Sequence, residues 1–214
     1  MTDGGVTDAA GPVARGSVAR VGLATAVAAM CGYAVFYLAA RGLAPAGFSV
    51  FGVFWGAFGL VTGAANGLLQ ESTREVRSSS AVNHGSNTRP MRVAAGVGVS
   101  AALLIAGTAL LWAPHVFADS RGLSVALLSV GLAGFCLHAT LLGIFAGVGR
   151  WTLYGTLMVS DALIRVAIAT AAFLLGWGLV GFLWATVGGA VAWLLLLTLS
   201  RTARTAAAVR TAGS

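Results

Sequence analysis

Six continuous apolar runs of about 20 residues each fill most of the chain, and each is long enough to cross a lipid bilayer as a helix. Outer-membrane strands instead alternate apolar and polar residues over about 10 positions, so the runs predict helices and not a barrel. Charged residues make up only 9% of the chain, whereas soluble domains hold about 25%. We therefore predict an all-α integral membrane protein, a bundle of about six transmembrane helices.

Turn residues and charges divide the chain into segments. We predict a disordered cytoplasmic tail over residues 1–17, a six-helix transmembrane bundle over 18–200 and a basic cytoplasmic tail over 201–214. The expected spans are at about 18–40, 48–69, 93–113, 122–147, 152–176 and 179–200. Proline interrupts helices, and all four prolines fall outside these spans: Pro12, Pro45, Pro90 and Pro114.

The arginines indicate the orientation of the bundle, because cytoplasmic loops carry an excess of positive charge. With a cytoplasmic N-terminus, the inner segments hold ten arginines and the outer segments hold two. Both termini and the polar loop 71–92 are therefore expected in the cytoplasm. The inner arginines are Arg15, Arg20, Arg74, Arg77, Arg89, Arg92, Arg150, Arg201, Arg204 and Arg210, and the outer ones are Arg41 and Arg121.

The fifth span contains two ionisable residues, Asp161 and Arg165. Charged groups deep in a bilayer are costly, so they usually face a bundle interior or a water-filled cavity and have a partner. Residues four apart share a helix face, so these two can neutralise each other. The pair is either a structural lock between helices or part of a substrate pathway, and we expect both side chains to face protein.

Spans four and five form a hairpin around Gly149, and His138 and Asp161 are about equally far from that turn. At 1.5 Å per residue both lie roughly 15 Å from the interface, near the middle of the bilayer. His138 is therefore a candidate neighbour of Asp161, and such a pair can serve as a proton relay. A histidine bonded to a backbone carbonyl or a serine is the alternative.

Further polar residues lie near the cytoplasmic ends of the spans. Glu71 and Arg74 are three apart, which suits a helical ion pair at the interface. Asn66 lies about one turn deeper and would line a cavity mouth or support a helix contact. Arg74, Arg77 and Arg150 are candidates for attracting anionic headgroups or pyrophosphates, although their role in setting the topology accounts for them as well.

The second span carries glycines at intervals of four residues, including Gly59, Gly63 and Gly67. A ridge of small residues lets two helix backbones approach closely. The pattern favours tight packing within the bundle, and helix sliding or dimerisation is the functional alternative.

Several classes of protein are disfavoured. The sequence has no HExxH or GxSxG motif, no lysine for a nucleotide-binding loop and no cluster of aspartates, so we expect no enzyme activity, metal site or cofactor. Cys31 and Cys136 lie in separate expected spans without metal-ligand spacing. The net charge of +7 comes from arginines at span ends and not from a basic face, which argues against nucleic-acid binding.

Three short segments at span ends share features with one transporter family. They are Arg41–Phe48 with Phe51 and Gly52, Gln70–Arg74, and Gly147–Trp151 with Tyr154. Over about Val18–Ser200 the chain resembles the N-terminal part of polysaccharide-biosynthesis flippases, in the multidrug/oligosaccharidyl-lipid/polysaccharide exporter superfamily. The resemblance implies translocation of undecaprenyl-pyrophosphate-linked sugars to the outer leaflet, through a cavity between two bundles of about six helices. One bundle encloses such a cavity only with a second copy or another chain.

These features favour a half-length transporter-type protein of the cell (cytoplasmic) membrane that translocates, or helps to translocate, lipid-linked polysaccharide precursors. Arg165 would then meet the anionic headgroup, with Asp161 and His138 beside it on the cavity face. The expected partners are membrane lipids, a lipid-linked glycan, and a second copy or a partner six-helix half. The alternative is a non-transporting membrane subunit or a degenerate fragment of such a flippase.

The topology is testable with single cysteines in a background that lacks Cys31 and Cys136. From outside intact cells, a membrane-impermeant thiol reagent should label Ser120→Cys, because this residue lies in an outer loop. Ser79→Cys should be protected. Labelling of Ser79→Cys with protection of Ser120→Cys would overturn the orientation.

Overall fold

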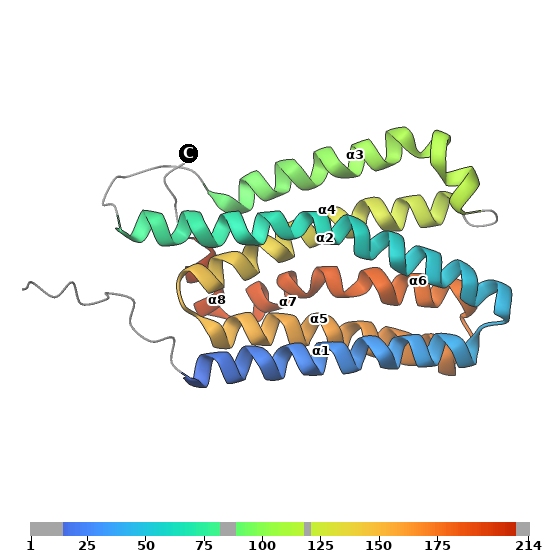
Figure 1. Cartoon of the computed structure of the whole chain (residues 1–214), viewed down its shortest axis with the longest axis horizontal. Helices are drawn as coiled ribbons and strands as arrows, with labels where there is room; N and C mark the ends of the chain where they lie inside the picture. Colours follow the sequence, from blue (N-terminus) through green and yellow to red (C-terminus); the bar gives the residue numbers. More distant parts are fainter. Residues whose placement is uncertain (1–14, 82–88, 118–120, 209–214) are drawn as a thin grey trace, which may run out of the picture.

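The computed structural model describes residues 15–81, 89–117 and 121–208, and its regular elements are all helical. The long helices lie side by side along the longest axis of the molecule (Figure 1). They are α1 (Arg15–Gly42), α2 (Pro45–Ala81), α3 (Pro90–Val116), α4 (Arg121–Gly147), α5 (Trp151–Leu174), α6 (Gly178–Gly188), the 3-10 turn η1 (Gly189–Val191), α7 (Ala192–Leu199) and α8 (Arg201–Ala207).

Six segments of the described chain are long and apolar enough to cross a membrane. Helices α1 to α5 each form one, and α6, η1 and α7 together form the sixth, Gly178–Leu199. The predicted all-α membrane bundle is confirmed. Six crossings return the chain to the side on which it started, so the beginning of α1 and helix α8 lie at the same end of the bundle (Figure 1).

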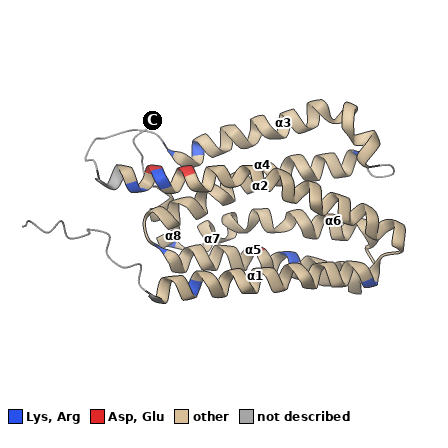
Figure 2. Cartoon of the chain, viewed as in Figure 1, with Lys and Arg blue, Asp and Glu red and all other residues tan. Residues whose placement is uncertain are grey.

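Charged residues lie mostly near the two ends of the bundle, as Figure 2 shows. One end is formed by the start of α1, the far end of α2 and the start of α5. It carries Arg20, Arg74, Arg77 and Arg150. We call it the arginine-rich end.

The element boundaries differ from the expected spans at three places. Helix α2 continues past the expected end of the span at residue 69 as far as Ala81, so the polar segment after the span begins as a helical extension. Residues 15–17 belong to α1, and the remainder of the expected N-terminal tail, 1–14, lies outside the described residues, as does Ser120. The expected basic tail begins instead with α8, where the Ser200 hydroxyl accepts a hydrogen bond from the Ala203 amide at 3.1 Å and Ala203 is buried.

Three prolines lie inside helices, and two of them stand where no amide donor is needed. Pro45 and Pro90 are the first residues of α2 and α3, positions at which the amide has no partner within the helix. Pro114 lies within the last turn of α3, so these three prolines stand outside the expected spans but inside the longer helices of the structure. Pro12 is outside the described residues.

Helix α4 occupies the centre of the bundle and is buried over most of its length, with α2 and α3 packed against it. The approach of α2 is closest near the arginine-rich end. A Cβ on Gly143 would collide with the Leu69 carbonyl oxygen and lie 2.8 Å from the Ser72 Cβ, and one on Gly147 would lie 2.6 Å from the Val76 Cβ. The Thr73 hydroxyl adds a hydrogen bond to the Gly143 carbonyl at 3.1 Å.

The glycine ridge of α2 does not make this contact. No atom lies within 4 Å of a Cβ built on Gly59, Gly63 or Gly67, and all three are exposed on the surface of the described bundle. The expectation that they pack within the bundle was therefore wrong. The helix uses its other face against α4, where the glycines come from α4 and not from α2.

We predict that Gly143→Ala destabilises the bundle by about 1–3 kcal/mol, because overpacking a tight helix contact forces the backbones apart. Gly63→Ala is the matched control, since its methyl group meets open space and alanine favours helix by up to about 1 kcal/mol. Thermal unfolding in detergent measures both. Equal melting temperatures for the two variants would contradict the close α2–α4 contact.

Candidate functional site

The two ionisable residues of α5 form a bidentate ion pair. Arg165 donates from Nε to Asp161 Oδ2 at 3.0 Å and from Nη2 to Oδ1 at 3.1 Å. The side chains are only 13% and 17% exposed, respectively. Two parallel bonds fix the geometry of a guanidinium and a carboxylate better than one. The expected pairing, with both side chains turned toward protein, is confirmed.

Arg165 also joins α5 to two other helices. Its Nη1 donates to the backbone carbonyl of Thr186 in α6, and its guanidinium carbon lies 5.4 Å from the centroid of the Phe58 ring in α2. A cation over an aromatic face is stabilised by about 0.5–2 kcal/mol, more when it is desolvated. One side chain therefore connects the second, fifth and sixth spans.

The sixth span is broken beside this pair. Helix α6 ends at Gly188 and gives way to η1, in which the Ala192 amide bonds the Gly189 carbonyl three residues earlier. The α-helical bond from the Ala190 amide to the Thr186 carbonyl is consequently absent. An unsatisfied carbonyl in a bilayer costs several kcal/mol, and Arg165 supplies the missing donor.

Gly189 is the residue that allows the span to pass over the ion pair. A Cβ at this position would lie 2.6 Å from Arg165 Nε and 2.7 Å from Asp161 Cγ, closer than real Cβ contacts. Gly188 is similarly crowded by the Ile168 side chain of α5. The two glycines therefore allow both the break in the sixth span and its close packing against α5.

His138 of α4 lies in the interior with 3% of its surface exposed. Its ring stacks on Phe135, with centroids 5.5 Å apart and an interplanar angle of 18°. Its Nδ1 atom has no hydrogen-bond partner among the described residues, and Asp161 gives both carboxylate oxygens to Arg165. The expected bond between His138 and Asp161 is thus not formed through Nδ1.

The other candidate residues belong to a separate, exposed region. Asn66 lies on the uncovered face of α2 beside the glycine ridge. Glu71 and Arg74 form the expected ion pair, at 2.7 Å, with side chains 46% and 70% exposed. Arg77 and Arg150 are also exposed, near the arginine-rich end. The structure therefore divides the candidates into a buried group around Asp161 and an exposed group on α2 and at this end.

Three parts of the buried group were not predicted from the sequence: Phe58, the Thr186 carbonyl and the glycine pair 188–189. A carbonyl and an aromatic ring leave no pattern that distinguishes them from their neighbours. Two adjacent glycines in an apolar span could have indicated a break, because paired glycines weaken helices.

Comparison with known proteins places the chain among larger relatives of undetermined role. An uncharacterized protein of Mycobacterium bovis is 65% identical over 207 residues, which cover 95% of this chain and 48% of the relative. An uncharacterized protein of Mycobacterium tuberculosis is 61% identical over 216 residues, covering 100% of this chain and 50% of the relative. The chain thus spans about half the length of the curated relatives it matches. No family model and no solved structure matches it.

We predict that Asp161→Asn destabilises the bundle more than Arg165→Gln. Breaking a buried pair costs about 3–5 kcal/mol, and an arginine left alone keeps its charge whereas an aspartate left alone can take up a proton. The double variant should regain part of the lost stability, because neither of the two introduced amide side chains carries a charge. Thermal unfolding of the four proteins in detergent gives the coupling energy.

The exposed pair supplies the control for this cycle. The changes Glu71→Gln and Arg74→Gln, alone and together, should show a coupling of at most about 1 kcal/mol, because water screens the pair. A coupling between Asp161 and Arg165 no larger than this would show that the buried contacts do not stabilise the fold.

Proposed function

We propose that the chain is one half of a two-lobed transporter of the cytoplasmic membrane that translocates, or helps to translocate, lipid-linked polysaccharide precursors. The observation that carries the proposal is the uncovered face of α2, on which small and amide residues are exposed. The length of the relatives supports it, since about half of each relative lies outside the matching part and could supply the other lobe.

The uncovered face of α2 combines two properties that suit a polar interior. Gly56, Gly59, Gly63 and Gly67 have nothing within 4 Å of an added Cβ, so they leave room for a bulky substrate. Asn66 and Gln70 are exposed beside them. Amide side chains in lipid lose their hydrogen-bond partners, whereas in a cavity they can bond to water or sugar hydroxyls.

The same helix leads to an open surface pocket of about 660 Å³ near the arginine-rich end, lined in part by arginines. Its lining includes Gln70, Thr73, Arg74 and Arg77. Arginines near a membrane surface attract anionic headgroups by about 1 kcal/mol each. We propose that this pocket, at the cytoplasmic side, receives the pyrophosphate of the lipid-linked glycan before the sugar enters along α2.

In this proposal the ion pair of α5 supports the lobe and does not contact the substrate. Asp161 and Arg165 are occupied by each other, and the remaining contacts of Arg165 go to Thr186 and Phe58. The proposed contact between Arg165 and a headgroup is therefore replaced by contacts from Arg74 and Arg77. The substrate-facing residues lie on α2.

A non-transporting subunit or a fragment of such a flippase is the second candidate, favoured by the half-length match to the relatives. The encoding of a second six-span half next to this chain would support the transporter. A full-length transporter encoded nearby would support the subunit or fragment.

The α2 face can be tested by thiol chemistry in nanodiscs, in a background without Cys31 and Cys136. We expect Asn66→Cys to react with a water-soluble thiol reagent, because it lines a hydrated interior. Leu110→Cys, at a position of α3 that is 88% exposed, should not react because it faces lipid. Failure of Asn66→Cys to react, together with a mass that shows a strict monomer, would overturn the two-lobed transporter.

Transport itself is measurable in vesicles that contain the protein and a fluorescent polyprenyl-pyrophosphate-linked sugar. Quencher added outside reports the fraction that reaches the outer leaflet. Arg77→Gln should slow translocation several-fold, whereas Arg41→Gln, near the opposite end of the bundle, should not. Equal rates with and without protein would contradict the proposed activity.

A further inference from the structure

A groove runs along the contact between α1 and α5, on the side of Arg20, and begins at the arginine-rich end. Its volume is about 360 Å³. The two helices run parallel here, and the lining extends from Arg20 to Val27 on α1 and from Trp151 to Ser160 on α5. At 1.5 Å per residue this corresponds to a length of about 11–14 Å, close to the thickness of one leaflet's hydrocarbon layer.

The polarity of the groove changes along its length. Its one charged residue, Arg20, lies at the arginine-rich end with Trp151 and Thr152. Deeper in the bundle Leu23, Val27 and Val159 line it, together with the uncharged hydroxyl residues Thr156 and Ser160. Arg20 is exposed and makes no ion pair among the described residues. A cation at the mouth of an apolar groove complements a molecule with an anionic head and a hydrocarbon chain.

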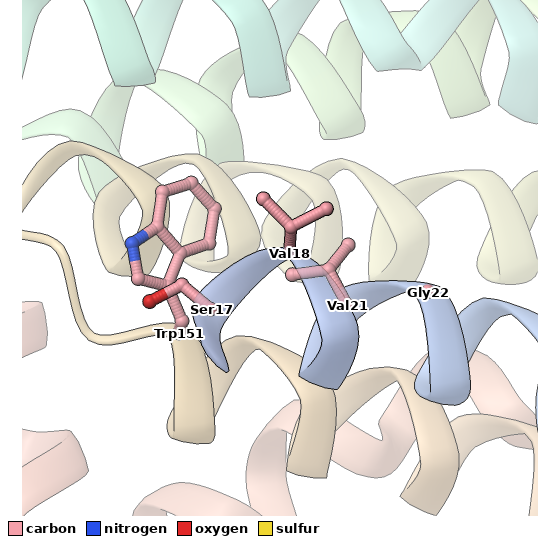
Figure 3. A pocket seen from close by; sticks show the side chains of 5 residues that line it. All are labelled: Ser17, Val18, Val21, Gly22 and Trp151. Carbon is pink, nitrogen blue, oxygen red and sulfur yellow. The ribbon is translucent and has the colours of Figure 1, made fainter. Parts of the chain in front are cut away.

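Trp151 forms the wall at the mouth and also borders a second, apolar pocket beside Val18 and Val21 of α1 (Figure 3). In this view its indole nitrogen lies on the side of Ser17, and Val18 and Val21 lie on the other side. The N–H group is therefore placed toward the polar end, the orientation that tryptophan takes at a membrane interface. It can donate a hydrogen bond at the level of Arg20.

We infer that this groove binds one anionic phospholipid, with its phosphate at Arg20 and Trp151 and one acyl chain along Leu23, Val27 and Val159. A zwitterionic lipid has the same acyl chains, but its headgroup places a second positive charge near Arg20. It should therefore bind more weakly than an anionic lipid. The site lies between α1 and α5, away from the α2 face, and its occupation does not depend on the proposed transport.

Native mass spectrometry of the detergent-solubilised protein tests the inference, with phosphatidylglycerol and phosphatidylcholine of identical chains as probes. The wild-type protein should retain one phosphatidylglycerol in preference to phosphatidylcholine. Arg20→Gln should weaken phosphatidylglycerol binding about fivefold, the equivalent of about 1 kcal/mol for one cation at a membrane surface. Arg41→Gln removes the same charge from the other end of α1 and should have no effect.

A second pair of variants tests the groove itself. Thr156→Phe places a ring across the groove from an exposed position of α5 and should weaken binding of both lipids at least fivefold. Ala167→Phe, three turns further along the same face, lies outside the groove and should leave binding unchanged.

Three outcomes would overturn the inference. They are equal retention of the two lipids by the wild-type protein, equal effects of Arg20→Gln and Arg41→Gln, and a dimer that Thr156→Phe dissociates without loss of lipid. The last result would show that a second copy of the chain occupies the groove. If Thr156→Phe does not fold, the comparison of the two lipids and the two arginine variants still decides the question.

Discussion

A guanidinium inside a bilayer cannot lose its charge, so Arg165 must find acceptors within the reach of one side chain. Two come from Asp161 on its own helix and one from the Thr186 carbonyl. The third acceptor is free only because the sixth span stops being α-helical there. The break is in turn possible only because Gly189 carries no side chain that would collide with the pair. The buried charge, the break in the sixth span and the glycine at position 189 therefore occur together for one physical reason.

The buried and exposed polar groups have different physical demands. Asp161 and Arg165 are bonded to each other and to the Thr186 carbonyl within the bundle, which leaves little of the pair for a substrate to bind. On α2 the glycines and amides have no partner within the described bundle. The bonded pair on α5 therefore suits stabilisation of the interior. The uncovered face of α2 suits contact with a molecule outside the bundle.

The number and type of helices could be predicted because a bilayer requires long apolar segments. The pairing of Asp161 with Arg165 could be predicted because four residues make slightly more than one helical turn. The packing partners of each helix face could not be predicted. Gly63 and Gly67 on α2 show the same spacing as Gly143 and Gly147 on α4, yet only the second pair lies against a neighbouring helix. Spacing identifies a face of a helix, and the tertiary arrangement decides what that face meets. The bond from Arg165 to a backbone carbonyl was unpredictable for a related reason, since every residue has a carbonyl.

The placement of both charges on α5 also has a consequence for biosynthesis. Helices of a membrane protein enter the bilayer one after another as the chain is made, and a lone arginine opposes insertion by about 2.5–3.5 kcal/mol. Because its counter-charge is four residues away on the same segment, α5 can enter as a locally neutral unit before the last span has been synthesised. The sixth span then arrives at a preformed pair and contributes the Thr186 carbonyl when it docks. A pair divided between two spans would instead leave the first of them charged in the membrane until the second arrived.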